Sequence, residues 1–83
     1  MAVELMLFSR PGCHLCEEFA QQLMGLQNRY DFVFHVVDIT GHDELMEQYG
    51  WIIPVLACGD EEICHVRLNE SALAQAVERR ARG

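Results

Sequence analysis

The stretch from Ser9 to Glu18, SRPGCHLCEE, decides how the chain folds. Pro11 and Gly12 interrupt an apolar run, and two cysteines, Cys13 and Cys16, follow at the start of a helix-like pattern. Because proline and glycine mark turns, this pattern predicts a strand that hands over to a helix, with the cysteine pair at the junction. Such a pair serves as a metal clamp, a structural disulfide or a redox-active dithiol.

The composition suits one domain over residues 1–83. Hydrophobic residues make up 51% of the chain, which is enough for an ordinary core without compulsory disulfides or metal ions. Thirteen acidic residues face six basic ones, all arginines, and the formal net charge is -7. Such a chain repels phosphate backbones and anionic lipids. We therefore expect no nucleic-acid or membrane partner, and we expect a monomer.

The N-terminal run Met1–Phe8 predicts neither a signal peptide nor a membrane span. It is short, lacks a basic start and contains Glu4. We therefore expect a cytoplasmic protein. In a reducing cytosol, paired cysteines are more often catalytic or metal-binding than structural, so a permanent disulfide is the least favoured of the three uses.

Apolar patterns on either side of the cysteine pair predict a βαβ unit. Val3–Phe8 has the length and bounding turn residues of a strand covered on both faces. Phe32–Ile39 is aromatic and β-branched with almost no alternation, as expected of a central strand between two layers. Between them, a stripe at helical spacing predicts a helix that buries Leu15, Phe19, Leu23 and Leu26. Strand, helix and strand in so short a span predict parallel strands with a right-handed crossover.

The second half of the chain predicts a helix, a hairpin and a final helix. Residues 44–49 carry two apolar side chains one helical turn apart, and Gly50 follows them. Residues 51–58 and 63–66 are apolar runs around a Gly-Asp turn, which is typical of a β-hairpin. Asn69 is a suitable N-cap for a last helix, with acids at its start and arginines at its end. The predicted order is therefore β-α-β-α-β-β-α.

A cysteine at the start of a helix is suited to nucleophilic chemistry. Unpaired backbone N–H groups and the positive end of the helix dipole stabilise a thiolate there, and such sites lower a thiol pKa by roughly one to several units from about 8.5. Cys13 is therefore the predicted nucleophile. Cys16 lies one helical turn further on, close enough to attack a mixed disulfide, and is the predicted resolving thiol.

Two other uses of the cysteines stay open. A zinc site needs four ligands and would have to recruit Cys58 and Cys64 or histidines, although five residues separate this second pair and the usual spacing is shorter. Cys58 and Cys64 are better explained as small buried hydrophobes. A domain that acts through partners, with an incidental dithiol, is the other alternative. No resident metal or tightly bound cofactor is expected.

The motifs resemble the thioredoxin superfamily. Cys13-His-Leu-Cys16 follows a first strand, Ile53-Pro54-Val55 opens a third, and the element order is that of the superfamily. The small size is similar to glutaredoxins, especially the short bacterial glutaredoxin-like proteins. The resemblance implies a thioredoxin fold of class α/β, with a four-stranded mixed sheet and helices on both faces. It also implies that Pro54 is cis and lies against the cysteine pair, and that the backbone of Ile53 pairs with the substrate chain.

The resemblance also implies an activity. Arg10, three residues before the first cysteine, matches the basic residue with which glutaredoxins hold glutathione, whereas their Gly-Gly pair has no match in residues 64–70, CHVRLNE. The implied function is a thiol-disulfide oxidoreductase that reduces protein disulfides or glutathione mixed disulfides, with glutathione as co-substrate and a reductase as electron donor. The alternative is a metal-binding or adaptor module of the same fold without turnover.

Overall fold

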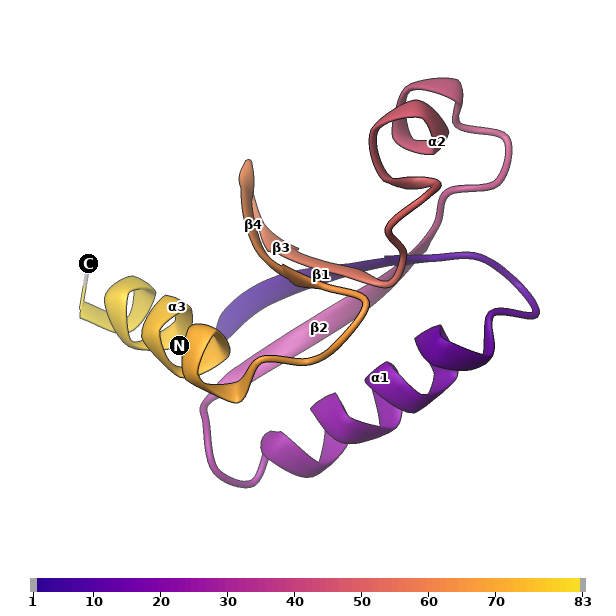
Figure 1. Cartoon of the computed structure of the whole chain (residues 1–83). Coiled ribbons are helices and arrows are strands. Elements are labelled where there is room, and N and C mark those ends of the chain that lie inside the picture. Colours follow the sequence, from indigo (N-terminus) through magenta and orange to yellow (C-terminus); the bar gives the residue numbers. More distant parts are fainter. Residues whose placement is uncertain (1, 83) are drawn as a thin grey trace.

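The predicted order of elements is confirmed by a computed structural model, which describes residues 2–82 (Figure 1). Along the chain, the elements are β1 (Val3–Ser9), α1 (His14–Leu26), β2 (Phe32–Asp38), α2 (Asp43–Tyr49), β3 (Val55–Cys58), β4 (Glu61–His65) and α3 (Glu70–Arg82). The strands form one sheet in the order β2-β1-β3-β4. β1 is parallel to β2 and antiparallel to β3, so the sheet is mixed, as predicted.

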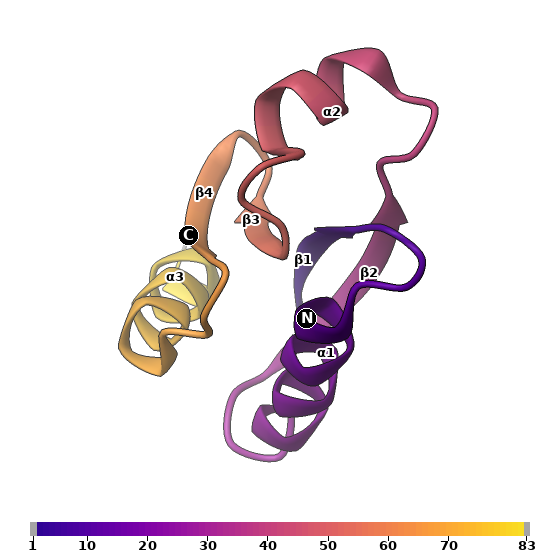
Figure 2. The same cartoon turned by 45° about the vertical axis from the view of Figure 1, so that its right-hand side comes forward.

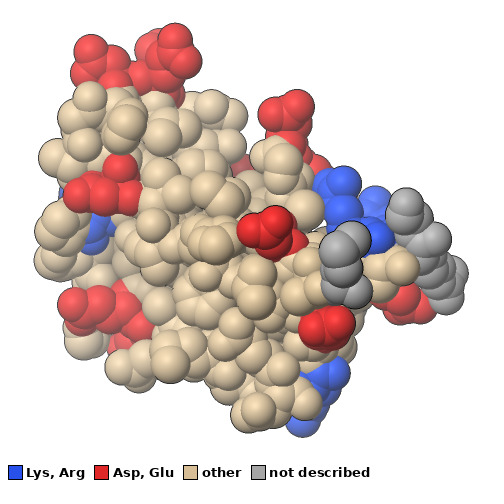
Figure 3. All heavy atoms as spheres, turned by 180° about the vertical axis from the view of Figure 1, so that it is seen from behind, with Lys and Arg blue, Asp and Glu red and all other residues tan. Residues whose placement is uncertain are grey.

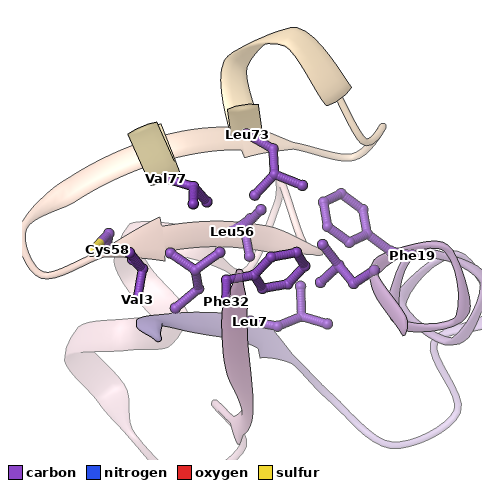
Figure 4. Packing of buried hydrophobic residues seen from close by; sticks show 10 residues of the cluster. Val3, Leu7, Phe19, Phe32, Leu56, Cys58, Leu73 and Val77 are labelled. Atoms are coloured by element: carbon purple, nitrogen blue, oxygen red, sulfur yellow. The ribbon is translucent and has the colours of Figure 1, made fainter. Parts of the chain in front are cut away.

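Helices cover the two faces of the sheet unequally. α1 and α3 lie on one face and α2 lies on the other (Figures 1 and 2). The core lies between the sheet and the two helices α1 and α3. There, Leu7 and Leu56 of the strands meet Phe19 of α1 and Leu73 of α3 (Figure 4). Burying one such side chain contributes about 1.5–3 kcal/mol, so this layer supplies most of the hydrophobic stabilisation.

The opposite face is only partly covered, which corrects the prediction for the first strand. In β1 the residues alternate, with Leu5 and Leu7 buried, Glu4 exposed and Phe8 intermediate. No residue of α2 is buried, and its Tyr49 ring stacks on Phe8 at a centroid separation of 4.7 Å. The strand is thus buried on one face and partly covered on the other.

No helix within residues 2–82 is long and apolar enough to cross a membrane.

β2 is an edge strand, which corrects the prediction of a central strand for Phe32–Ile39. It pairs only with β1, and Val33 and Val36 expose 39% and 58% of their surface. A β-branched and aromatic composition reports a preference for extended backbone, whereas the position within a sheet depends on which other strands pair with it. Ile39, just beyond the strand, is fully buried.

The predicted β-hairpin is confirmed, but its first strand is shorter than expected. β3 covers only Val55–Cys58, and residues 51–54 form the connection from α2. The two strands pair antiparallel around a turn in which Gly59 has a φ of 60°, a left-handed value that glycine adopts without steric cost. Cys58 and Cys64 both lie in or against the core cluster, in line with the prediction that they act as small hydrophobes.

The start of α3 is held by a cap and by a polar cluster. The Asn69 Oδ1 atom accepts a hydrogen bond from the backbone N–H of Ala72 at 3.0 Å, which confirms the predicted N-cap. The next residue, Glu70, accepts hydrogen bonds from the Tyr30 hydroxyl and the Arg29 guanidinium, both at 2.8 Å. These bonds tie the connection between α1 and β2 to α3, and they lower the pKa of the Glu70 carboxyl, the Tyr30 bond being the larger cause.

Replacing Glu70 with Gln is expected to lower the melting temperature at pH 7. A carboxyl whose pKa is lowered on folding contributes stability above its unfolded value, near 4.5, and that contribution is lost as the pH falls through the folded value. The difference in melting temperature between Glu70→Gln and the unmodified protein should therefore narrow from pH 7 to pH 3. Thermal unfolding followed by circular dichroism measures it, and a constant difference would contradict the assigned role.

Val66, between β4 and α3, adopts a backbone conformation that β-branched residues rarely take. Its φ is 66°, and it is the one non-glycine residue with a positive φ among residues 2–82. Its backbone N–H donates to the Pro54 carbonyl oxygen at 2.8 Å, which holds the segment against the connection that enters β3. A left-handed conformation costs an L-residue about 1–2 kcal/mol.

Replacing Val66 with Gly is expected to stabilise the fold. The strain of about 1–2 kcal/mol disappears, and it outweighs the larger entropy of glycine in the unfolded chain, about 0.5–1 kcal/mol. The net gain in the free energy of unfolding should be about 1 kcal/mol or less, measured by urea denaturation. Val66→Ala, which keeps the Cβ atom, is the matched control and should gain less. A Gly variant less stable than the Ala variant would show that the entropy cost of glycine outweighs the backbone strain, and would contradict this prediction.

Candidate active site

A tight turn delivers the cysteine pair from β1 to α1. The backbone N–H of Cys13 donates to the Arg10 carbonyl oxygen at 3.3 Å, and Pro11 and Gly12 occupy the two central positions. Gly12 has a φ of 77°, the value that the second central residue of a type II turn requires. The proline-glycine pair therefore reverses the chain within four residues and places Cys13 at the beginning of the helix.

Cys13 is the N-cap of α1, as the sequence predicted. Its backbone is extended, and its sulfur accepts a hydrogen bond from the backbone N–H of Cys16 at 3.2 Å. Serine, threonine or aspartate usually supplies this acceptor with oxygen, so here a sulfur atom takes the oxygen's place. Once the pair is reduced, the same N–H group and the helix dipole stabilise the Cys13 thiolate.

The two cysteines are joined as a disulfide with a Cα–Cα distance of 5.2 Å. Cys13 is partly exposed, whereas Cys16 exposes 5% of its surface. A disulfide exchange reaction needs one sulfur that an incoming client can reach and one that is shielded until the first has reacted. Of the two sulfurs, that of Cys13 is the one a client can reach, and the roles of nucleophile for Cys13 and resolving thiol for Cys16 stay predictions.

Leu15 does not belong to the core, which corrects the predicted apolar stripe of α1. Phe19 and Leu23 are buried as expected and Leu26 packs against the core, but Leu15 exposes 50% of its surface. The buried position in the first turn is Cys16 instead. Helical spacing alone does not reveal that Leu15 lines a hollow beside residues 66–68.

Charged side chains surround the exposed first turn of α1. The His14 ring lies 3.2 Å from the Glu18 carboxylate and 4.0 Å from that of Glu17, with 82% of its side chain exposed. This pairing directs the histidine along the helix surface.

Over the face in Figure 3, acidic side chains are scattered, in keeping with the net charge of -7. The largest basic area on this face lies on the side where α3 ends.

Arg10 lines a cavity of about 310 Å³ beside the disulfide. Both cysteines line the same cavity, as do Glu17 and Asp38. The structure therefore brings Arg10 together with Cys13 and Cys16, as predicted, and Asp38 is a carboxylate that sequence reasoning did not place there. The Asp38 carboxylate accepts a hydrogen bond from the backbone N–H of Thr40 at 2.9 Å, and this bond lowers the pKa of the Asp38 carboxyl.

Ile53 and Pro54 lie at the end of the sheet where β1 leads into the turn. Phe8 of β1 pairs with Val55 of β3, so the two residues before Val55 lie beside the last residues of β1. The peptide bond between Ile53 and Pro54 is cis. Pro54 is buried and Ile53 is partly exposed. Trp51, in the same connection, exposes 94% of its surface.

A second hollow flanks the first turn of α1. It has a volume of about 410 Å³ and is lined by Leu15, Glu18, Phe19, Gln22, Val66, Arg67 and Leu68. We call it the Leu15–Leu68 groove. Sequence reasoning missed it, because Leu15 was assigned to the core and because no local pattern predicts a positive φ for a valine. The missing Gly-Gly pair in residues 64–70 was the one feature that pointed to this segment.

The remaining cysteines lie outside this site. Cys58 donates to the Glu4 carbonyl oxygen at 3.5 Å, and burial raises the pKa of the Cys64 thiol. Neither is part of a disulfide. Among residues 2–82, no three His, Cys, Asp or Glu side chains are grouped so that they would hold a metal ion.

Known structures share this architecture. Protein Ne2328 from Nitrosomonas europaea is 33% identical, covers 93% of each chain and superposes with a TM-score of 0.84. Thioredoxin 1 from Thermosipho africanus is 17% identical with a TM-score of 0.61, over 95% of this chain and 94% of that one. Mitochondrial thioredoxin 3 from Saccharomyces cerevisiae, in its oxidized form, is 22% identical with a TM-score of 0.60, over 92% and 76%. No curated protein matches the sequence significantly.

Sheet order, helix placement and the disulfide at the start of α1 define a protein with the thioredoxin fold. The model of the family named Glutaredoxin-like domain (DUF836) matches residues 4–78, and the chain belongs to this family. The family resemblance and the thioredoxin fold predicted from the sequence are thus confirmed. Together with the Cys13–Cys16 disulfide, they support a redox role.

In the reduced protein, Cys13 is expected to react with iodoacetamide before the other cysteines. The helix start stabilises its thiolate, whereas Cys58 is buried and the pKa of Cys64 is raised by burial. Alkylation for increasing times at pH 6.5, followed by peptide mass spectrometry, measures the order. Urea-unfolded protein is the control, in which all four thiols should react at similar rates. Equal rates in the folded protein would contradict an activated Cys13.

Proposed function

We propose that the protein is a cytoplasmic thiol-disulfide oxidoreductase that reduces protein disulfides or glutathione mixed disulfides. The observation that carries the proposal is the hydrogen bond from the Cys16 N–H to the Cys13 sulfur at the start of α1, with Cys16 shielded behind it. This arrangement favours the thiolate at the sulfur that a client can reach. Arg10, which lines the cavity beside the cysteines together with Glu17 and Asp38, is the cation available to a client there.

The reaction proceeds by two exchange steps. The Cys13 thiolate attacks one sulfur of the client disulfide, forms a mixed disulfide and releases the first client thiolate. Cys16 then loses its proton and attacks the Cys13 sulfur, which closes the Cys13–Cys16 disulfide and releases the second client thiolate. The client gains two electrons and two protons, and the protein dithiol loses them. A reductase or two glutathione molecules return the pair to the dithiol.

Ile53, Pro54 and Arg10 have binding roles in this proposal. The connection before β3 lies at the same end of the sheet as the cysteine turn, so the backbone of Ile53 is available to an extended client beside Cys13. Arg10 steers a client that carries a carboxylate near its cysteine. These residues contact the client, and the two cysteines carry out the exchange.

Replacing Cys13 with Ser is expected to abolish reduction of every disulfide substrate, because the serine hydroxyl does not ionise near neutral pH. Replacing Cys16 with Ser should abolish reduction of protein disulfides and retain part of the activity with a glutathione mixed disulfide, for which one thiol suffices. Initial rates with insulin and with a glutathionylated peptide, each with glutathione and with dithiothreitol as reductant, measure both effects.

Cys58→Ser is the matched control, since Cys58 lies in the core away from the site, and it should keep both activities. If the unmodified protein reduces neither substrate with either reductant, the proposed function is wrong and the adaptor alternative is favoured. Full activity of the Cys13→Ser variant would refute the assignment of the nucleophile.

A further inference from the structure

The Leu15–Leu68 groove lies beside the segment that is proposed to contact clients. Leu15 sits between the two cysteines in sequence, and Val66 is hydrogen-bonded to Pro54. The groove therefore runs from the first turn of α1 to the segment that precedes α3. The groove thus begins two residues along the chain from Cys13, the residue to which a client would be attached.

Two apolar side chains that line the groove, Leu15 and Val66, are exposed to solvent. Leu15 exposes 50% of its surface and Val66 exposes 36%. Val66 does so from a φ of 66°, where glycine would fit without strain. An exposed leucine and an unfavourably held valine at one hollow are explained if an apolar group of the client is buried between them.

A positive charge in the groove, that of Arg67, favours a client with an acidic side chain. Among the arginines whose side chains are described, Arg29, Arg79 and Arg80 bind carboxylates. Of these described arginines, only Arg10 and Arg67 have no carboxylate partner among the described side chains. Arg10 lines the cavity beside the disulfide, and Arg67 lines the groove. Glu18, which also lines the groove, is paired with His14 at 3.2 Å. In a chain of net charge -7, Arg67 is thus the cation that an acidic client meets there.

We propose that the Leu15–Leu68 groove binds an extended protein segment whose disulfide is reduced, with an apolar side chain next to its cysteine against Leu15 and Val66 and an acidic side chain beyond it at Arg67. The proposal rests on the proposed function and names the substrate class: protein disulfides are preferred over glutathione. Glutathione carries carboxylates but has no apolar side chain for the space between Leu15 and Val66.

The test uses the reduced protein and three peptides, each with its cysteine as a mixed disulfide with 2-mercaptoethanol. The first peptide has Leu next to Cys and Glu beyond it, the second has Ser for Leu, and the third has Gln for Glu. Single-turnover rate constants are measured for each peptide and for glutathione disulfide. The first peptide should react about three- to tenfold faster than the other two, as expected for one buried apolar group and one exposed ion pair. It should also react faster than glutathione disulfide.

Variants then locate the preference. Val66→Gly should remove the preference for Leu over Ser, and Arg67→Gln should remove the preference for Glu over Gln. Arg79→Gln is the matched control, because Arg79 binds Glu61 on the hairpin, and it should keep both preferences. Thermal unfolding of each variant verifies that it is folded.

Equal rates for the three peptides, or preferences that survive both groove variants, would overturn the proposed groove. Glutathione disulfide reacting faster than the first peptide would overturn the preference for proteins. If the reduced protein reacts with no disulfide at all, the proposed function fails together with this inference. If it reacts with all of them alike, only the inference fails.

Discussion

One hydrogen bond sets the geometry of the site: the Cys16 backbone N–H points at the sulfur of Cys13. It forms because the turn at Pro11 and Gly12 stops β1 and starts α1 at a fixed residue, so that a sulfur occupies the position where an N-cap accepts. The rest of the core maintains this junction. β1 is clamped between β2 and β3, and α1 is anchored on it through Phe19 and Leu23.

Features encoded by near neighbours could be predicted from the sequence. The strand-turn-helix at Cys13, the cap at Asn69 and the hairpin around Gly59 each depend on a few consecutive residues whose conformational preferences agree. Their succession then left few possible topologies, and the family resemblance selected one. For the same reason, the position of Cys13 and Cys16 at the start of a helix could be predicted from the sequence alone.

Features that depend on distant parts of the chain could not be predicted. An apolar strand such as β2 looks the same whether one strand or two pair with it, so its edge position was missed. Leu15 has the spacing of a core residue, yet it lines the groove beside residues 66–68 and stays half exposed. Val66 was missed because hydrogen bonding to Pro54, and not the preference of valine, fixes its backbone. The groove between Leu15 and Val66 is therefore a product of tertiary structure alone.

The helix α2 contributes little to the hydrophobic core of this small domain. Because this helix buries no side chain and rests on the stacked rings of Phe8 and Tyr49, it can detach while the main hydrophobic layer stays intact. Hydrogen exchange at its amides then reports local opening, and protection in β1 and β3 reports global unfolding. Among the helices, α2 is therefore the one where we expect a probe on the outer surface to disturb the hydrophobic layer least.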